Sequence, residues 1–187
     1  MSLLWQALCF FWLAGEVYIA IATRRRNSAG ANQDRGSQLV LWIAVVLALT
    51  IAGFLRAWLP PQFHWHQPWI RPLSLFLLAV GLAVRAIAIL TLGRWFTANV
   101  VTRPGQTLNR SGLYGVVRHA SYLGMEIIFL AFGLHAASWP ALLIGFIPPT
   151  LAVIYRIRVE EAALAAVFGT EYDQYRRQTS RLVPGLY

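Results

Sequence analysis

Two short segments carry most of the residue types that could do chemistry. The first runs from Gly112 to Gly124 and reads Gly-Leu-Tyr-Gly-Val-Val-Arg-His-Ala-Ser-Tyr-Leu-Gly. The second runs from Arg156 to Glu161 and reads Arg-Ile-Arg-Val-Glu-Glu, at the end of another apolar run. Ionisable groups inside or beside membrane segments normally face a protein interior or a cavity. We therefore interpret the two segments as the walls of one site at a membrane surface.

The spacing of Arg156 and Glu160 predicts a shared helix face, because residues four apart are neighbours on a helix surface. The Glu160 carboxylate could then brace the guanidinium, and a braced arginine is a hydrogen-bond donor for a substrate carboxylate or a similar oxyanion. The alternative is a surface ion pair, which adds little stability. We favour the functional interpretation because the pair lies at the predicted membrane boundary.

Arg118 and His119 lie where a polar loop meets the next apolar segment. Taken alone, the arginine is explained as a contact with lipid headgroups, and the histidine as a hydrogen-bonding residue at a helix start. Composition and spacing therefore predict a polar, arginine-containing pocket at the cytoplasmic face of a helical membrane protein.

The composition indicates a membrane protein. Of the 187 residues, 58% are hydrophobic and 12% are charged, whereas roughly a quarter are charged in soluble domains. Five apolar stretches approach the ~20 residues that an α-helix needs to cross the hydrocarbon. They lie near residues 3–22, 39–59, 73–92, 122–137 and 139–157. We expect an all-α, polytopic membrane protein, a single domain over residues 1–187 with about five transmembrane helices and a cytoplasmic C-terminal helical tail.

The arginines predict the orientation. The net charge of +9 comes from sixteen arginines with no lysine, and thirteen of them fall on one side of the predicted spans. Cytoplasmic segments carry an excess of basic residues. We therefore expect the N-terminus outside, the C-terminus and the polar site in the cytoplasm, and the protein in a bacterial inner membrane. Because topology explains the charge, we expect no nucleic-acid partner.

Two ionisable residues lie inside the predicted spans. Glu16 is expected to be held by a polar group of a neighbouring helix, and Arg85 either to reach the interface or to enter a polar pocket. The polar connection from Asn27 to Gln38 is interpreted as a loop without a fold of its own, and it is assigned no chemistry.

The two polar segments are parts of a longer pattern. It reads Gly112-Leu113-Tyr114, then Arg118-His119-Ala120-Ser121-Tyr122-Leu123-Gly124, then Arg156 followed by Glu160-Glu161-Ala162-Ala163-Leu164. This pattern resembles that of the isoprenylcysteine carboxyl methyltransferase family, which joins Gly-x-Tyr-x-x-x-Arg-His-Pro-x-Tyr-x-Gly to a later Arg-x-x-x-Glu-Glu-x-x-Leu. The resemblance covers about half of the chain, from Gly93 to Pro184. Ala120 stands where the family usually has proline, which fixes the angle of the chain at a helix start.

The resemblance implies a multi-span helical enzyme that binds S-adenosylmethionine from the cytoplasm and receives a lipophilic acceptor from among the membrane lipids, without a metal. It implies a cofactor region over residues 93–187. The matching positions imply these cofactor contacts: Asn99, Gln106, Thr107, Leu108, Asn109, Tyr114, Arg118, His119, Ala120, Ser121, Tyr122 and Glu161. Arg156 and Glu160 are implied as the catalytic pair on the substrate side.

The predicted function is methyl transfer from S-adenosylmethionine to the carboxylate of an isoprenylcysteine-like substrate. In this hypothesis Arg156 orients the acceptor and Glu160 orients Arg156. The ring faces of Tyr114 or Tyr122 help to hold the sulfonium by cation–π attraction. Two alternatives stay open: the acceptor is an amine, thiol or phenol on a small lipophile, or the protein is a non-catalytic membrane scaffold or carrier.

Overall fold

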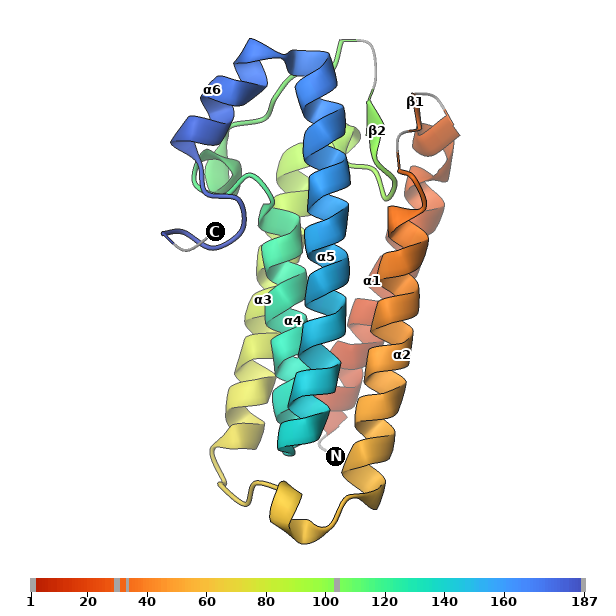
Figure 1. Ribbon diagram of the computed structural model, residues 1–187, viewed down its shortest axis with the longest axis vertical. Coiled ribbons are helices and arrows are strands. Elements are labelled where there is room, and N and C mark those ends of the chain that lie inside the picture. The colour runs from red at the N-terminus through yellow and green to blue at the C-terminus, as the bar shows by residue number, and fades with distance from the viewer. Residues whose placement is uncertain (1–2, 29–30, 33, 103–104, 186–187) are drawn as a thin grey trace.

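Five long helices lie side by side in one bundle (Figure 1). The computed structural model describes residues 3–28, 31–32, 34–102 and 105–185. The bundle consists of α1 (Leu3–Ser28), α2 (Ser37–Trp58), α3 (Ile70–Leu92), α4 (Ala120–His135) and α5 (Trp139–Phe168). A short helix, α6 (Thr170–Gln178), and two short strands, β1 (Ala31–Asn32) and β2 (Val101–Thr102), lie at one end of the bundle. Three 3₁₀ turns complete the fold: η1 (Pro61–Phe63), η2 (Gly93–Trp95) and η3 (Gly112–Gly115).

The prediction of an all-α, multi-pass membrane protein is confirmed. In the described part of the chain, four helical segments are long and apolar enough to cross a membrane: Leu3–Thr23, Ser37–Trp58, Ile70–Trp95 and Trp139–Phe168. The fourth predicted span, near residues 122–137, corresponds to Ala120–His135, which is apolar but shorter. Its 16 residues rise about 24 Å, less than the ~30 Å of a bilayer's hydrocarbon core. The fourth predicted span is therefore a shorter helix within the bundle.

Helix α5 is long enough to extend beyond the membrane core, and its extension includes the second polar segment, Arg156 to Glu161. Its 30 residues continue through Pro148 and Pro149, and they span about 45 Å at 1.5 Å per residue. The helix ends at Gly169, which has a positive φ of 50°. The predicted extension to Phe168 and the second short helix before Pro184 are both present. Arg156 and Glu160 consequently lie on a continuous helix, one turn apart.

Two glycines allow α3 and α4 to approach closely. A Cβ added at Gly124 would lie 2.7 Å from the backbone nitrogen of Arg85, and one added at Gly81 would lie 2.8 Å from Ile128 Cγ1. Small residues of this kind permit close helix packing in membranes. The approach brings Arg85 of α3 next to the first turn of α4, where the Gly112–Gly124 segment continues into the helix.

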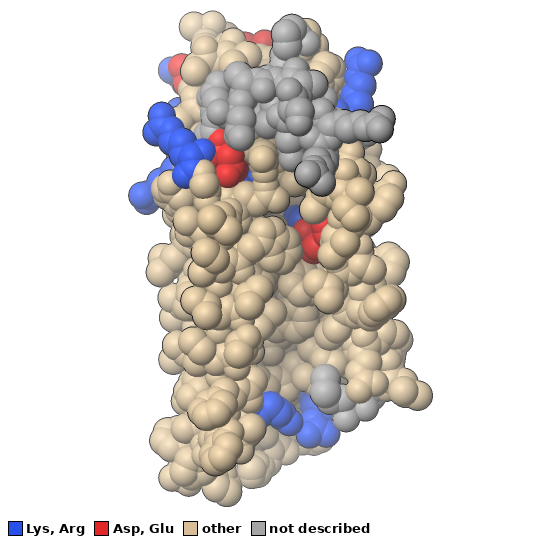
Figure 2. Space-filling view, turned by 90° about the vertical axis from the view of Figure 1, so that its right-hand side faces the viewer, with Lys and Arg blue, Asp and Glu red and all other residues tan. Residues whose placement is uncertain are grey.

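The middle of the bundle exposes apolar side chains. Figure 2 shows a wide band with few charged atoms, and coloured atoms gather toward the two ends. Large exposed hydrophobic residues include Phe10, Leu39, Val46, Phe54, Phe76, Leu90 and Leu151. A continuous apolar surface of this size suits contact with lipid. The core between the helices contains Trp5, Trp12, Val45, Leu78, Ile128, Phe129, Val153 and Ile157.

Two backbone pairings at the α6 end join segments that are far apart in the sequence. β1 pairs with β2 in antiparallel register, Ala31 opposite Thr102, so the loop between α1 and α2 has structure of its own, contrary to the prediction. Val117 and Ser180 form a parallel bridge, and the backbone N–H of His119 donates to Arg181 O at 3.2 Å. These pairings hold the first loop and the C-terminal tail against the segments that enclose the site.

Candidate active site

A pocket opens at the α6 end of the bundle, enclosed by α1 to α5 and the loop after α3. Twelve of the fourteen predicted site residues line it: Asn99, Gln106, Thr107, Leu108, Asn109, Tyr114, Arg118, His119, Ser121, Tyr122, Arg156 and Glu160. Apolar side chains from the membrane helices, including Ile19, Leu41, Trp42 and Met125, line the same pocket. The lining of the pocket thus combines polar and apolar side chains.

Arg156 is buried, and its guanidinium contacts several segments of the chain. Nη1 donates to Asp34 Oδ1 at 2.7 Å and to Ser37 Oγ at 2.9 Å. Nη2 donates to the Ala98 carbonyl, and Nε donates to the Tyr122 hydroxyl oxygen at 2.8 Å. The connection from Asn27 to Gln38, to which the sequence analysis assigns no chemistry, supplies the carboxylate that pairs with this arginine. Asp34 is the one carboxylate in the sequence between the first two apolar stretches. That isolated acid was the sequence feature that could have indicated a partner for a buried arginine.

Several hydrogen bonds hold Asp34 in its ionised form. Its Oδ2 accepts from the Gln38 backbone N–H at 3.1 Å, and its Oδ1 accepts from Ser37 Oγ at 2.9 Å. Burial alone would raise the pKa of the Asp34 carboxyl, but the Gln38 N–H, the charge of Arg156 and the Ser37 hydroxyl together hold the pKa below its usual range. Asp34 is therefore an anion at neutral pH.

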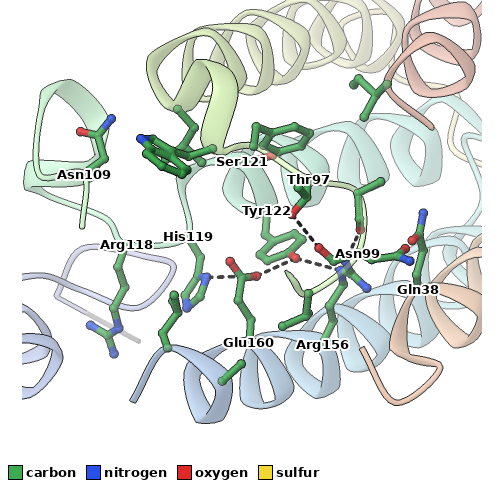
Figure 3. Close-up of a pocket in the computed structure, with 18 of the residues that line it drawn as sticks. Gln38, Thr97, Asn99, Asn109, Arg118, His119, Ser121, Tyr122, Arg156 and Glu160 are labelled. Atoms are coloured by element: carbon green, nitrogen blue, oxygen red, sulfur yellow. Dashed lines mark hydrogen bonds and ion pairs between the residues drawn. The ribbon is translucent and has the colours of Figure 1, made fainter. Parts of the chain in front are cut away.

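Tyr122 lies between Arg156 and Glu160, as Figure 3 shows. Its hydroxyl donates to Glu160 Oε2 at 2.8 Å while accepting from Arg156 Nε. The direct bracing of Arg156 by Glu160, predicted from their spacing, is wrong, because the guanidinium turns toward Asp34 and reaches Glu160 only through the phenol. The Glu160 side chain keeps 33% of its surface exposed, compared with 4% for Arg156.

Glu161, the next residue along α5, contacts a different set of side chains. Its Oε1 accepts from Arg118 Nε at 2.8 Å and from Arg181 Nε at 3.1 Å, and it lies 3.3 Å from His119 Nε2. The opposite nitrogen of His119 lies 4.0 Å from Glu160 Oε2. Glu161 does not line the pocket, contrary to the prediction; instead it holds two pocket residues and the C-terminal tail together.

Ala120 is the second predicted residue that lies away from the pocket surface. It is buried beside Ala88 and Tyr114 in a small apolar cluster. The methyl group packs where α4 begins, so this position shapes the wall behind the pocket and presents no group to it.

Glu16 and Arg85 form an ion pair within the membrane helices. Arg85 Nε donates to Glu16 Oε1 at 2.5 Å, Nη2 donates to Oε2 at 2.7 Å, and Nη1 donates to Ser121 Oγ at 2.9 Å. The expectation that a neighbouring helix holds Glu16 is confirmed, and Arg85 enters a polar pocket. Both residues line the site, where sequence reasoning had not placed them.

The loop after α3 covers the pocket with polar and aromatic groups. Thr97 Oγ1 donates to the Asn99 carbonyl at 2.8 Å, and Asn109 Nδ2 donates to the Thr91 carbonyl at 2.9 Å. Trp95 and Phe96, which the sequence interpretation missed, also line the pocket. The Asn109 bond thereby anchors the loop to α3.

Tyr114 presents a buried hydroxyl to the pocket. The residue is 5% exposed, and its hydroxyl has no hydrogen-bond partner among the residues that the structure describes. Burial raises the pKa of this phenol above its usual range, so the hydroxyl is neutral and can donate a hydrogen bond. A buried polar group without a partner is costly unless a ligand satisfies it.

A comparison with protein-family models matches residues 73–166 to the isoprenylcysteine carboxyl methyltransferase family. The chain belongs to this family. The match extends from the start of α3 to the end of α5, and it includes both polar segments. The resemblance of the two segments to the family's pattern is thus confirmed over half of the chain.

Individual members of the family and other relatives show the same similarity. The chain is 29% identical over 113 residues to protein-S-isoprenylcysteine O-methyltransferase of Schizosaccharomyces pombe, covering 59% of this chain and 48% of that protein. It is 35% identical over 83 residues to methanethiol S-methyltransferase 2 of Bradyrhizobium diazoefficiens, covering 44% of this chain and 31% of that protein. The chain therefore spans about half or less of the length of these relatives.

A solved structure shares the fold. The eukaryotic intramembrane Ras methyltransferase of the family superposes with a TM-score of 0.65 at 22% identity, over 78% of this chain and 52% of that chain. The helical arrangement around the pocket is therefore that of the family.

Proposed function

We propose that the chain is a single membrane-embedded domain that transfers a methyl group from S-adenosylmethionine to a lipophilic acceptor. The observation that carries this proposal is the mixed lining of the pocket. Charged and hydrogen-bonding groups line it together with apolar side chains of the membrane helices. Such a pocket suits a reaction between a polar cofactor and the head of a lipid-soluble molecule.

The residues present fit the cofactor. Several groups line the pocket: the Tyr114 hydroxyl, which has no partner among the described residues, the partly exposed Glu160 carboxylate, and the rings of Trp95 and Phe96. A carboxylate and aromatic faces attract a cation such as a sulfonium. S-adenosylmethionine, when bound, would supply an electrophilic methyl group: a nucleophile takes the methyl carbon, the bond from that carbon to the sulfonium sulfur breaks, and S-adenosylhomocysteine is the leaving group.

The proposed cofactor contacts are Asn99, Gln106, Thr107, Leu108, Asn109, Tyr114, Arg118, His119, Ser121 and Tyr122, all in the pocket lining. Glu161 and Ala120 do not line the pocket and support residues that do. Glu161 binds Arg118 and contacts His119. Ala120 packs against Tyr114.

The first candidate acceptor is the carboxylate of an isoprenylcysteine-like molecule. An ionised carboxylate needs no base, so the contribution of the protein is orientation, which can supply ~7–11 kcal/mol when reacting groups are well placed. Arg156 is the proposed orienting cation. Of its five N–H groups, four donate to described residues, and one N–H of Nη2 is left for the acceptor.

One observation favours a thiol as a second candidate. Glu160 lines the pocket, and among the described residues it has no arginine partner, whereas Glu16, Asp34 and Glu161 all do. A thiol must lose its proton before sulfur attacks, and Glu160 is placed to take it while the new S–CH₃ bond forms. The methanethiol S-methyltransferase among the relatives adds support for this acceptor.

The test is a methyl-transfer assay in detergent or vesicles with labelled S-adenosylmethionine and two acceptors, an S-farnesylcysteine derivative and a long-chain alkanethiol. A carboxylate acceptor predicts a rate that is flat above pH ~5, since an exposed carboxyl group ionises near 4. A thiol acceptor predicts a rate that rises with pH and falls in Glu160→Gln. Transfer to neither compound, by a protein that binds no cofactor, would refute the methyltransferase assignment.

We further propose that the pocket faces the cytoplasm of a bacterium and that the N-terminus lies outside. The arginine distribution supports this orientation. Arg56 and Arg71 lie near the η1 end of the bundle, and most other arginines belong to segments at the α6 end. Arg103, one of the thirteen, lies outside the described residues.

A further inference from the structure

Asp34 contacts the site from outside the segment matched by the family. The match begins at residue 73, and Asp34 belongs to the connection between α1 and α2. Its carboxylate is nevertheless one of the closest partners of Arg156, at 2.7 Å. The side chains of Asp34 and Arg156 are 9% and 4% exposed, so this ion pair is shielded from water.

Asp34 is itself fixed by the first turn of α2. The Ser37 backbone N–H donates to the Asp34 carbonyl at 2.8 Å, the Ser37 hydroxyl donates to Oδ1 and the Gln38 N–H donates to Oδ2. Gly36 holds the N-cap position of α2, and the Asp34 side chain caps the helix from two residues before it by accepting from a backbone N–H of the first turn. Because the carboxylate is anchored at both oxygens, it presents a rigid acceptor to the guanidinium.

The position of Asp34 determines which way the guanidinium turns. With Nη1 held by Asp34 and Ser37, the planar group directs Nε at Tyr122 and Nη2 at Ala98. Without the carboxylate, an uncompensated buried cation would remain, and it would reorient toward Glu160 or water. The direction of the remaining Nη2 N–H would then be lost.

We propose that Asp34 is a positioning residue that holds Arg156 in the orientation needed for methyl transfer, so that the connection between α1 and α2 is part of the reactive site. This inference rests on the proposed function. Asp34 touches neither the pocket surface nor the reacting atoms; it acts through Arg156. The competing explanation is purely structural, in which Asp34 only caps α2.

The variant Asp34→Asn separates the two explanations. Asparagine keeps the acceptor oxygen and the size of the side chain, so it can still cap α2, but it removes the charge that pairs with Arg156. Asp34→Glu restores the charge and serves as the conservative rescue. Asp173→Asn is the matched control, because Asp173 is an exposed aspartate on α6 with 58% of its side chain accessible.

The first readout needs no acceptor. Phenylglyoxal modifies accessible arginines, and mass spectrometry gives the rate at each one. Asp34→Asn is expected to speed modification of Arg156 by about tenfold, because the buried pair that shields it is broken. Arg85, which Glu16 holds, should keep its wild-type rate in every variant. An unchanged rate at Arg156, or equal increases at Arg156 and Arg85, would overturn the proposal.

The second readout is a double-mutant cycle on transfer to whichever acceptor is active. Asp34→Asn is expected to lower kcat by about tenfold, with less than a twofold change in the Kd for S-adenosylhomocysteine and partial rescue by Asp34→Glu. In an Arg156→Gln background, Asp34→Asn should alter kcat by less than about twofold, because the guanidinium that Asp34 positions is no longer present. Equal losses in both backgrounds would show a structural role.

The two proposals fail in different ways. If the wild-type protein binds no S-adenosylhomocysteine, the proposed function is refuted. If it binds S-adenosylhomocysteine but Asp34→Asn leaves Arg156 protected and kcat unchanged, only the role of Asp34 is refuted.

Discussion

At the level of single residues, the Tyr122 hydroxyl connects the two groups that were expected to touch directly. It accepts from Arg156 and donates to Glu160, so one oxygen fixes both the cation and the carboxylate of the site. A hydroxyl that bridges charged partners contributes more than a neutral hydrogen bond, because each bond involves an ionised group.

Tyr122→Phe removes that bridge and leaves the ring in place. Each hydrogen bond to a charged group contributes about 1.5–3 kcal/mol, so kcat is expected to fall by about 10- to 100-fold. Steady-state kinetics on the purified protein measure it. Tyr155→Phe, at an exposed residue of α5, is the control and should leave kcat unchanged. A Tyr122→Phe protein with the wild-type kcat would mean that the bridge has no role in catalysis.

At the level of the helices, α1 is attached to the bundle by few polar contacts. Most of its large apolar side chains face outward, while Trp5 and Trp12 pack into the core and Glu16 pairs with Arg85. An ion pair in the bilayer region is strong only while both partners are present, because a single charge there is costly. The pair therefore fixes α1 against the pocket.

Glu16→Gln is expected to lower the free energy of unfolding by about 3–5 kcal/mol, because Arg85 is left buried and unpaired. Thermal denaturation in detergent measures the loss, with Glu171→Gln, at an exposed acid, as the control. Replacing both partners by apolar residues, Glu16→Leu with Arg85→Met, should recover much of the stability. A Glu16→Gln protein with the wild-type Tm would contradict the anchoring role of the pair.

The connection between α1 and α2 has a predictable pH dependence. The pKa of Asp34 is lower in the folded protein, so its ionised form stabilises the fold above the unfolded pKa of ~4, and this contribution disappears as the pH falls through the folded value. The Tm difference between the wild type and Asp34→Asn should be constant from pH 8 to ~5 and shrink below ~4. A difference that vanished between pH 7 and 6 would show a raised pKa instead.

At the level of the whole molecule, the sequence predicted the helices well because apolar length is a strong signal. Through the resemblance to the family it also predicted ten residues between Asn99 and Tyr122 that line the pocket, although Ala120 in this range does not. It could not predict that Asp34, Glu16 and Arg85 join the site. Their partners lie more than 30 residues away along the chain, and spacing rules report only neighbours on one helix.

The arginine distribution predicts a cytoplasmic C-terminus. A green fluorescent protein fused after the last residue should fluoresce in a bacterial host, and alkaline phosphatase at the same place should be inactive, because it folds only outside the cytoplasm. Active phosphatase at the C-terminus would reverse the orientation and place the pocket outside the cell.

The central claim is that the pocket binds S-adenosylmethionine, and calorimetric titration of S-adenosylhomocysteine into the detergent-purified protein tests it most directly. The account predicts saturable binding to one site, weakened by His119→Ala and by Tyr122→Ala but unchanged by Tyr155→Ala. Absence of saturable binding to the folded protein at high ligand concentration would contradict the account and favour a non-catalytic membrane protein. Binding that neither pocket substitution weakens would place the cofactor elsewhere.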